Sequence, residues 1–106
     1  MKNVRTAVLA VCLGALGSMA APAQFNTQYG AGALPGSTGS SNAAFGYDAL
    51  NSNIEGGVYN TATGYTALYA NTTGFDNSAF RSMALQFNST GSNNTVTGFS
   101  ALRTYP

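Results

Sequence analysis

The sequence is organised by a motif that returns about every 17 residues. Its clearest copy, residues 60–74, reads NTATGYTALYANTTG, with Asn at position 1, Gly at position 5 and Ala-Leu at positions 8 and 9. The Ala-Leu pairs begin at residues 33, 49, 67, 84 and 101, so they are spaced 16, 18, 17 and 17 residues apart. A short, fixed period predicts a fold built by stacking similar units.

Three positions of the motif define the predicted repeat, and each is occupied by one residue type in nearly every copy. The structural repeat positions are Asn26, Asn42, Asn60, Asn77 and Asn94 at position 1, Gly30, Gly46, Gly64 and Gly98 at position 5, and Leu34, Leu50, Leu68, Leu85 and Leu102 at position 9. The fourth copy has Arg81 in place of glycine at position 5.

Each copy predicts two short strands and two turns. Positions 3 and 4 alternate between small apolar and larger or hydroxylated residues, as Ala62 and Thr63 do, and this period of two is typical of a strand. The Ala-Leu segment predicts a second strand. Glycine at position 5 indicates a positive φ or a close approach of the next unit, and Asn71 and Gly74, with their equivalents, predict a left-handed return turn.

These features predict an all-β fold, a parallel β-solenoid of about five coils. In such a stack, residues at the same position of successive coils lie in columns about 4.8 Å apart. The position-1 asparagines are then expected to hydrogen-bond to one another as a ladder. The leucines are expected to form an apolar column.

The chain divides into three predicted segments. Residues 1–23 are typical of a secretory signal peptide, with Lys2 and Arg5 before an apolar run and small residues before Gln24. Residues 24–41 are either a Gly/Ser-rich linker or a degenerate first coil. Residues 42–106 are predicted to form the solenoid repeat domain. We therefore expect a secreted protein at the cell surface or outside the cell, with no membrane insertion after cleavage.

The charge of the chain after residue 23 is low, and this excludes several function classes. The charged side chains there are Asp48, Glu55, Asp76, Arg81 and Arg103, which sum to −1. Neither nucleic acid nor an anionic membrane is an electrostatically favoured partner. The segment has no histidine or cysteine, and its three acids fall in different repeat positions, so we expect no enzyme activity, no cofactor and no metal site.

The aromatic residues outnumber what a thin coil can bury, and they predict a contact surface. The candidate interface residues are Phe45, Tyr47, Tyr65, Tyr69, Phe80, Phe87 and Phe99. A small stack without disulfides gains stability from a partner, which favours a subunit interface. A face for carbohydrate is the alternative. The T-x-T pairs at residues 61–63 and 95–97 also suggest an ice-binding face, but residues 78–80 interrupt it.

Residues 42–50, 60–68 and 94–102 resemble the N-T-A-V-G-Y-x-A-L repeats of bacterial and phage tail-fibre-like proteins. More loosely, they are similar to the head repeats of YadA-type trimeric autotransporter adhesins. The resemblance implies a left-handed parallel β-roll that trimerises and serves as an extracellular fibre or adhesive head. The chain departs from the pattern at Arg81-Ser82 and at Ala31.

The predicted function is a secreted, non-enzymatic structural or adhesive surface module that self-associates, as a homotrimer, and contacts a host or surface glycan or protein. Two alternatives remain open at this point. One is a pilin-like subunit that forms a filament through its terminal coils. The other is a glycan- or ice-binding β-solenoid.

Overall fold

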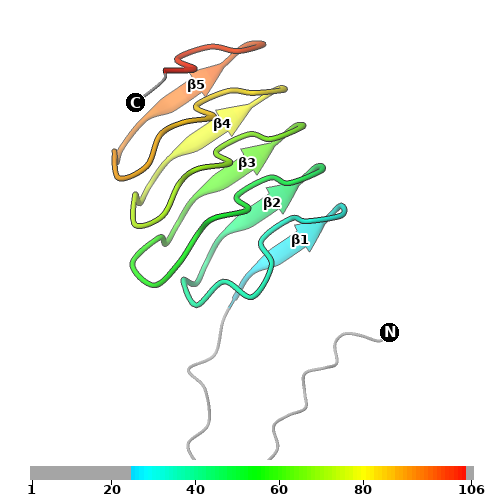
Figure 1. The fold of residues 1–106 in the computed structure, drawn as a ribbon. Helices are drawn as coiled ribbons and strands as arrows, with labels where there is room; N and C mark the ends of the chain where they lie inside the picture. The colour runs from blue at the N-terminus through cyan, green and yellow to red at the C-terminus, as the bar shows by residue number, and fades with distance from the viewer. Residues whose placement is uncertain (1–24, 105–106) are drawn as a thin grey trace, which may run out of the picture.

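A computed structural model describes residues 25–104, which form a β-solenoid. The predicted all-β class with stacked parallel strands is confirmed (Figure 1). The strands are β1 (Thr27–Tyr29), β2 (Ala43–Phe45), β3 (Thr61–Thr63), β4 (Ser78–Phe80) and β5 (Thr95–Thr97), in the sheet order β1-β2-β3-β4-β5. The predicted signal peptide lies outside the described residues.

The strands pair in the register of the sequence repeat. Ala44 of β2 pairs with Ala62 of β3, which pairs with Ala79 of β4, and Ala79 pairs with Val96 of β5. All four are buried. A slip of one residue would turn these side chains outward, so burial of position 3 maintains the register. β1 pairs in the same way with β2, and the segment from residue 26 to residue 41 therefore forms the first coil.

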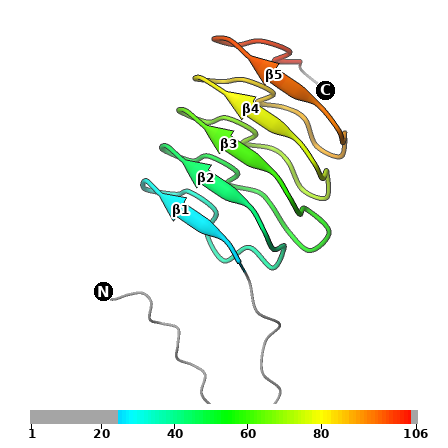
Figure 2. The same ribbon diagram turned by 180° about the vertical axis from the view of Figure 1, so that it is seen from behind.

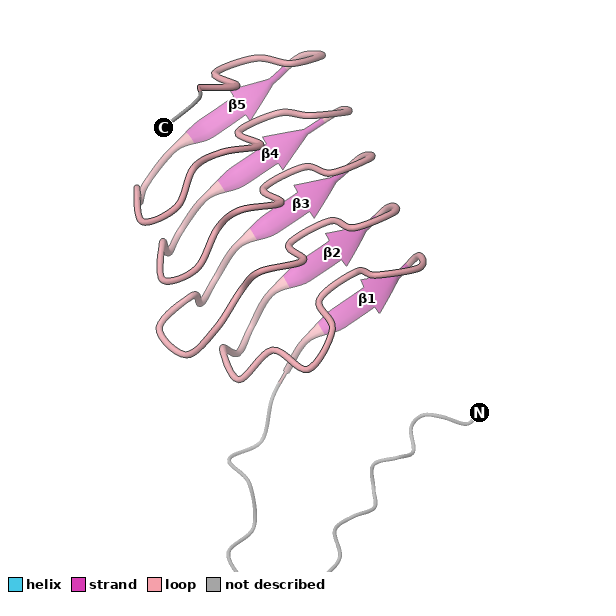
Figure 3. Ribbon diagram, in the orientation of Figure 1, coloured by secondary structure: helices cyan, strands magenta, loops and turns pink. Residues whose placement is uncertain are grey.

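Each coil contains one strand and not the predicted two. Figures 1 and 2 show the strands aligned in one wall, and Figure 3 shows that loops and turns close the rest of each coil. The Ala-Leu segment is not extended because positions 7 and 9 have positive φ, 55° at Asp48 and 52° at Leu50. The coils still bond to one another there, since the Leu50 N–H donates to the Ala67 carbonyl at 3.0 Å.

The predicted left-handed return turn is also wrong in its details. Asn71 and Gly74 do not have positive φ. At the end of the return turn, positive φ occurs instead at the residue directly before the position-1 asparagine. These residues are Tyr59, Asp76 and Asn93, with φ between 54° and 64°. The asparagines of the return turn serve instead as hydrogen-bonding groups inside the coil.

The core of the solenoid is thin and consists of small aliphatic side chains. Its buried members are Ala33, Leu34, Ala44, Ala49, Leu50, Ala62, Ala67, Leu68, Ala79, Ala84, Leu85 and Val96. Four of the five position-9 leucines form the predicted apolar column, whereas Leu102 in the last described coil is 59% exposed. No aromatic ring of residues 25–104 belongs to this core. The large apolar side chains consequently lie on the outside.

Candidate functional site

The position-1 asparagines form the predicted ladder. The Asn60 Nδ2 donates to Asn42 Oδ1 at 3.2 Å, and Asn77 Nδ2 donates to Asn60 Oδ1 at 3.1 Å. Asn94 continues the ladder by donating to Asn77 Oδ1 at 2.9 Å. Asn26 begins it, since its Oδ1 accepts from the Asn42 N–H at 2.9 Å. These side chains therefore hold adjacent coils together.

A second ladder, which the sequence analysis assigned only to turn formation, runs beside the first. Asn71 Nδ2 donates to Asn53 Oδ1 at 2.8 Å, and Asn88 Nδ2 donates to Asn71 Oδ1 at 3.1 Å. The two ladders meet at one carbonyl in each of the second, third and fourth coils: in the third, that of Gly74 accepts from Asn60 at 2.9 Å and from Asn71 at 3.0 Å. The spacings of 18 and 17 residues between these asparagines were the signal for this ladder.

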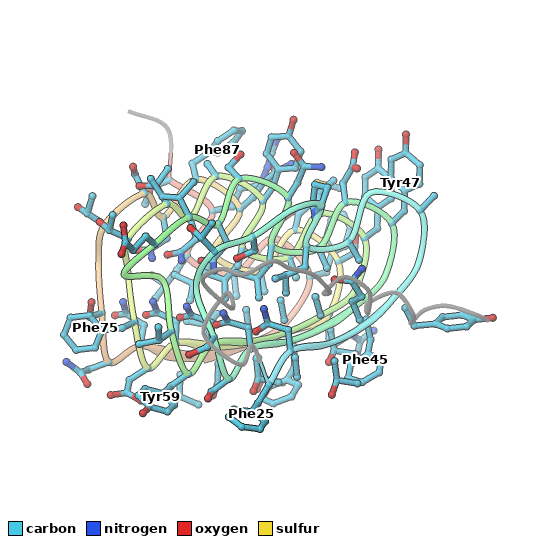
Figure 4. The ribbon with its side chains drawn as sticks, turned by 90° about the horizontal axis from the view of Figure 1, so that it is seen from below. Phe25, Phe45, Tyr47, Tyr59, Phe75 and Phe87 are labelled. Carbon is cyan, nitrogen blue, oxygen red and sulfur yellow. The ribbon has the colours of Figure 1, made fainter. Side chains whose placement is uncertain are left out.

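The outward face of the strand wall, here called the sheet face, is flat and rich in aromatic rings. It carries the side chains of positions 2 and 4 and of the residue before position 1. Its exposed aromatics are Phe25, Tyr29, Phe45, Tyr59 and Phe80, which are between 37% and 79% exposed. Figure 4 shows Phe25, Tyr59 and Phe45 pointing outward from the same side of the coil. In the register of the repeat, Asp76 is the one charged residue among the described residues of this face.

The structure divides the seven candidate interface residues among three surfaces. Phe45 and Phe80 belong to the sheet face, and Tyr69 and Phe87 are half-buried on the wall that carries positions 10 and 11. The position-6 residues Tyr47, Tyr65 and Phe99 follow the turn at position 5 and form a separate column. Figure 4 shows Tyr47 and Phe87 directed away from the sheet face.

Three residues of the sheet face, Phe25, Tyr29 and Tyr59, were missed by the sequence analysis. Tyr29 occupies position 4 of the first coil, the position of Phe45 and Phe80 in later coils. Extending the two-residue alternation of each strand backward by one step would also have placed Phe25 and Tyr59 on this face.

The position-6 column contains a stacked pair and then a gap. The rings of Tyr47 and Tyr65 have centroids 5.6 Å apart and planes inclined by 12°. The next coil places Ser82 in the column, and the last described coil places Phe99 there. Arg81, directly before Ser82, is exposed and has a φ of 98°. This departure from the repeat thus lies between two exposed rings.

The wall opposite the strands is held by side-chain contacts within the chain. Gln86 Nε2 donates to the buried Thr66 Oγ1 at 3.0 Å. Arg103 donates to Gln86 Oε1, and its guanidinium carbon lies 5.4 Å from the centroid of the Phe87 ring. Cation–π contacts of this kind stabilise a surface by roughly 0.5–1 kcal/mol. These residues therefore stabilise the stack.

The acidic residues occupy different positions of the repeat. Within residues 25–104, no group of three or more His, Cys, Asp or Glu side chains could hold a metal ion. Asp48 Oδ1 accepts from Asn51 Nδ2 at 3.2 Å, while Glu55 and Asp76 are exposed. Over the same range, no helix is both long and apolar enough to pass through a membrane.

Comparisons of the chain with protein-family models, with curated proteins and with solved structures gave no match. The surfaces of the solenoid are therefore the basis for inferring its function. Among them, the sheet face exposes five aromatic rings on a flat wall.

Proposed function

We propose that the chain is a secreted, non-enzymatic structural or adhesive module that associates with copies of itself through the sheet face. The expected number of chains is three, as implied by the resemblance to trimeric fibre and adhesin repeats. The observation that supports the proposal is the exposure of five aromatic rings on this face while the core contains only Ala, Leu and Val. Contiguous exposed apolar patches larger than a few hundred Å² typically mark an interaction site.

A second copy fits the sheet face because the face is flat, nearly uncharged and regularly spaced. Its rows of side chains repeat about every 4.8 Å, so identical rows of another copy can interdigitate with them across a distance of about 10 Å. From the second coil onward, rings alternate with small side chains along the position-4 column, where Phe45 is followed by Thr63 and Phe80 by Thr97. Rings of one copy can therefore occupy the spaces beside the threonines of another.

Burial of these rings also supplies stabilisation that the thin core does not provide. A chain of about 80 residues buries a smaller fraction of its surface on folding than a larger domain does, and the only cysteine, Cys12, belongs to the predicted signal peptide. Burial of an aromatic side chain contributes about 1.5–3 kcal/mol. Association through the sheet face is therefore expected to stabilise each coil stack.

The experiment is a light-scattering measurement of the mass of residues 24–106 over a range of concentrations, with the same samples imaged by negative-stain electron microscopy. We expect a constant mass of three chains. The double variant F45T/F80T is expected to be a folded monomer, because Thr63 and Thr97 already occupy this position in neighbouring coils. The control Tyr47→Ser removes a ring from the position-6 column, which accepts Ser82, and should leave the mass unchanged.

Two results would contradict the proposal. A folded monomer of the unaltered chain would show that the sheet face does not bind a second copy. Uniform fibres that still form from F45T/F80T would indicate end-to-end stacking through the terminal coils, which is the filament alternative.

A further inference from the structure

We propose that the space between the rings of Tyr65 and Phe99 is a binding slot for one flat aromatic ring that carries a negative charge. The slot lies in the position-6 column, above Ser82, and is distinct from the sheet face. It is formed where the fourth coil departs from the repeat at two adjacent residues, Arg81 and Ser82. The same coil retains the repeat elsewhere, including Asn77 in the ladder and Leu85 in the core.

Backbone hydrogen bonds set the width of the slot. The Met83 N–H donates to the Tyr65 carbonyl at 2.8 Å, and the Ser100 N–H donates to the Ser82 carbonyl at 2.9 Å. Position 6 of the third, fourth and fifth coils therefore lies on consecutive levels, which places Tyr65 and Phe99 two levels apart, or about 9.6 Å. A ring midway would lie about 4.8 Å from each, within the 4.5–7 Å range of stacked aromatic pairs.

The column itself shows that rings on adjacent levels stack. Tyr47 and Tyr65 do so at 5.6 Å with nearly parallel planes. A ring inserted above Ser82 would extend this arrangement to four rings. The two walls of the slot are open to solvent, since Tyr65 is 52% and Phe99 67% exposed.

Arg81 gives the slot its charge preference. The glycines at position 5 of the other coils have φ between 124° and 142°, and Arg81 has φ of 98°. A non-glycine residue with such a backbone conformation destabilises the fold by on the order of 1–3 kcal/mol. Backbone strain of this kind is concentrated at functional sites. Arg81 is exposed and directly precedes Ser82 in the chain, and a guanidinium favours a carboxylate or another anionic group on the ligand.

The test is a titration of residues 24–106 with 4-hydroxyphenylacetate, followed by NMR. We expect a saturable upfield shift of the ring protons of this probe, because they would lie between two aromatic rings. Two comparison probes separate the contributions of the ring and the charge. Cyclohexylacetate, which has the charge without a flat ring, should not bind, and 4-methylphenol, which has the ring without the charge, should bind several-fold more weakly.

Variants locate the site and have a matched control. Ser82→Tyr fills the slot and should weaken binding of the probe at least tenfold, and Phe99→Ser, which places at this position the residue type of Ser82, removes one wall. The control Thr90→Tyr adds the same ring to an exposed return turn and should leave binding unchanged. Arg81→Gly should remove the preference for 4-hydroxyphenylacetate over 4-methylphenol.

Each contrary result overturns a stated part of the proposal. Unchanged affinity in Ser82→Tyr, with the fold intact by circular dichroism, would overturn the slot. Binding of cyclohexylacetate with equal affinity would overturn the requirement for a flat ring, and an unchanged probe preference in Arg81→Gly would overturn the role of the charge. The F45T/F80T variant should bind the probe like the unaltered chain, so failure of the sheet-face proposal is distinguished from failure of this one.

Discussion

Asn60 donates two hydrogen bonds to a single oxygen of Asn42. Its backbone N–H lies 2.8 Å from Asn42 Oδ1, and its Nδ2 lies 3.2 Å from the same atom. Asn77 repeats this arrangement on Asn60 Oδ1, at 3.0 and 3.1 Å. Both Asn42 and Asn60 are buried, and such polar groups are tolerated in a protein interior only when they are hydrogen-bonded. The ladder thus couples the position of each coil to the coil before it.

Replacement of Asn60 by alanine is expected to be among the most destabilising single changes. It removes one of the two donors to the Gly74 carbonyl and the acceptor of two bonds from Asn77, and it leaves the buried backbone N–H of Asn77 without an acceptor. An unpaired buried N–H costs about 1–3 kcal/mol and each other lost hydrogen bond about 0.5–1.5 kcal/mol, so we expect the free energy of unfolding to fall by roughly 3–5 kcal/mol. Urea denaturation measures this change. The control Asn94→Ala, at a half-buried residue of the last described coil, should cost much less, and equal losses would contradict a cooperative ladder.

Gly46→Ala should disrupt the close stacking of the position-5 turns. A Cβ atom at Gly46 would lie 2.6 Å from the Gly64 carbonyl oxygen, so the backbone of one coil would have to move. Gly98 is a matched control with nearly the same φ, 142° against 139°, and its added Cβ would meet the Ala101 Cβ at 3.4 Å. We expect Gly98→Ala to lower stability by about 1 kcal/mol through backbone strain. Gly46→Ala should lower it by clearly more, as measured by thermal unfolding.

Arg81→Gly is expected to stabilise the solenoid slightly. Glycine adopts the positive φ of position 5 without strain, whereas arginine costs about 1–3 kcal/mol there. The greater freedom of glycine in the unfolded chain offsets about 0.4–1 kcal/mol of this gain. We therefore expect the urea midpoint to rise or to stay constant. A marked fall would show that the Arg81 side chain makes a stabilising contact of its own.

Leu68→Ala tests the apolar column at its centre. Leu68 is fully buried, and truncation of a buried leucine costs about 2–5 kcal/mol because it leaves a cavity. Leu102 occupies the same position of the repeat but is largely exposed. The matched change Leu102→Ala should cost less than about 1 kcal/mol in the same denaturation experiment. Comparable losses at the two sites would mean that Leu102 is buried in solution, as it would be under a further stacked chain.

The fold class could be predicted from the sequence because the repeat itself encodes the stacking. When Asn42, Asn60, Asn77 and Asn94 recur at a nearly constant interval, only a structure that places them one above another satisfies all of them in the same way. The second strand could not be predicted in this manner. Whether the Ala-Leu segment is extended or curled depends on the φ of Leu50 and its equivalents. Leucine rarely adopts a positive φ, so its local conformational preference does not predict the observed angle.

The candidate surfaces were only partly predictable for a related reason. The sequence analysis recognised an excess of aromatic residues, yet Phe45 and Tyr47 are two residues apart and point to different surfaces because the turn at Gly46 lies between them. Likewise, Ser82 is notable in the sequence only as an irregularity. Only the stacking of the coils places this small residue between Tyr65 and Phe99, where we propose the binding slot.

By itself, the sequence determined the period, the parallel register and the first asparagine ladder, since these depend on which residue types recur at a fixed interval. The tertiary structure decided the single strand per coil, the second ladder through Asn53, Asn71 and Asn88, and the separation of the aromatic rings into the sheet face and the position-6 column. These features depend on the backbone angles at the turns. Such angles are set by hydrogen bonds and close contacts with the neighbouring coil, and not by the residues of one repeat alone.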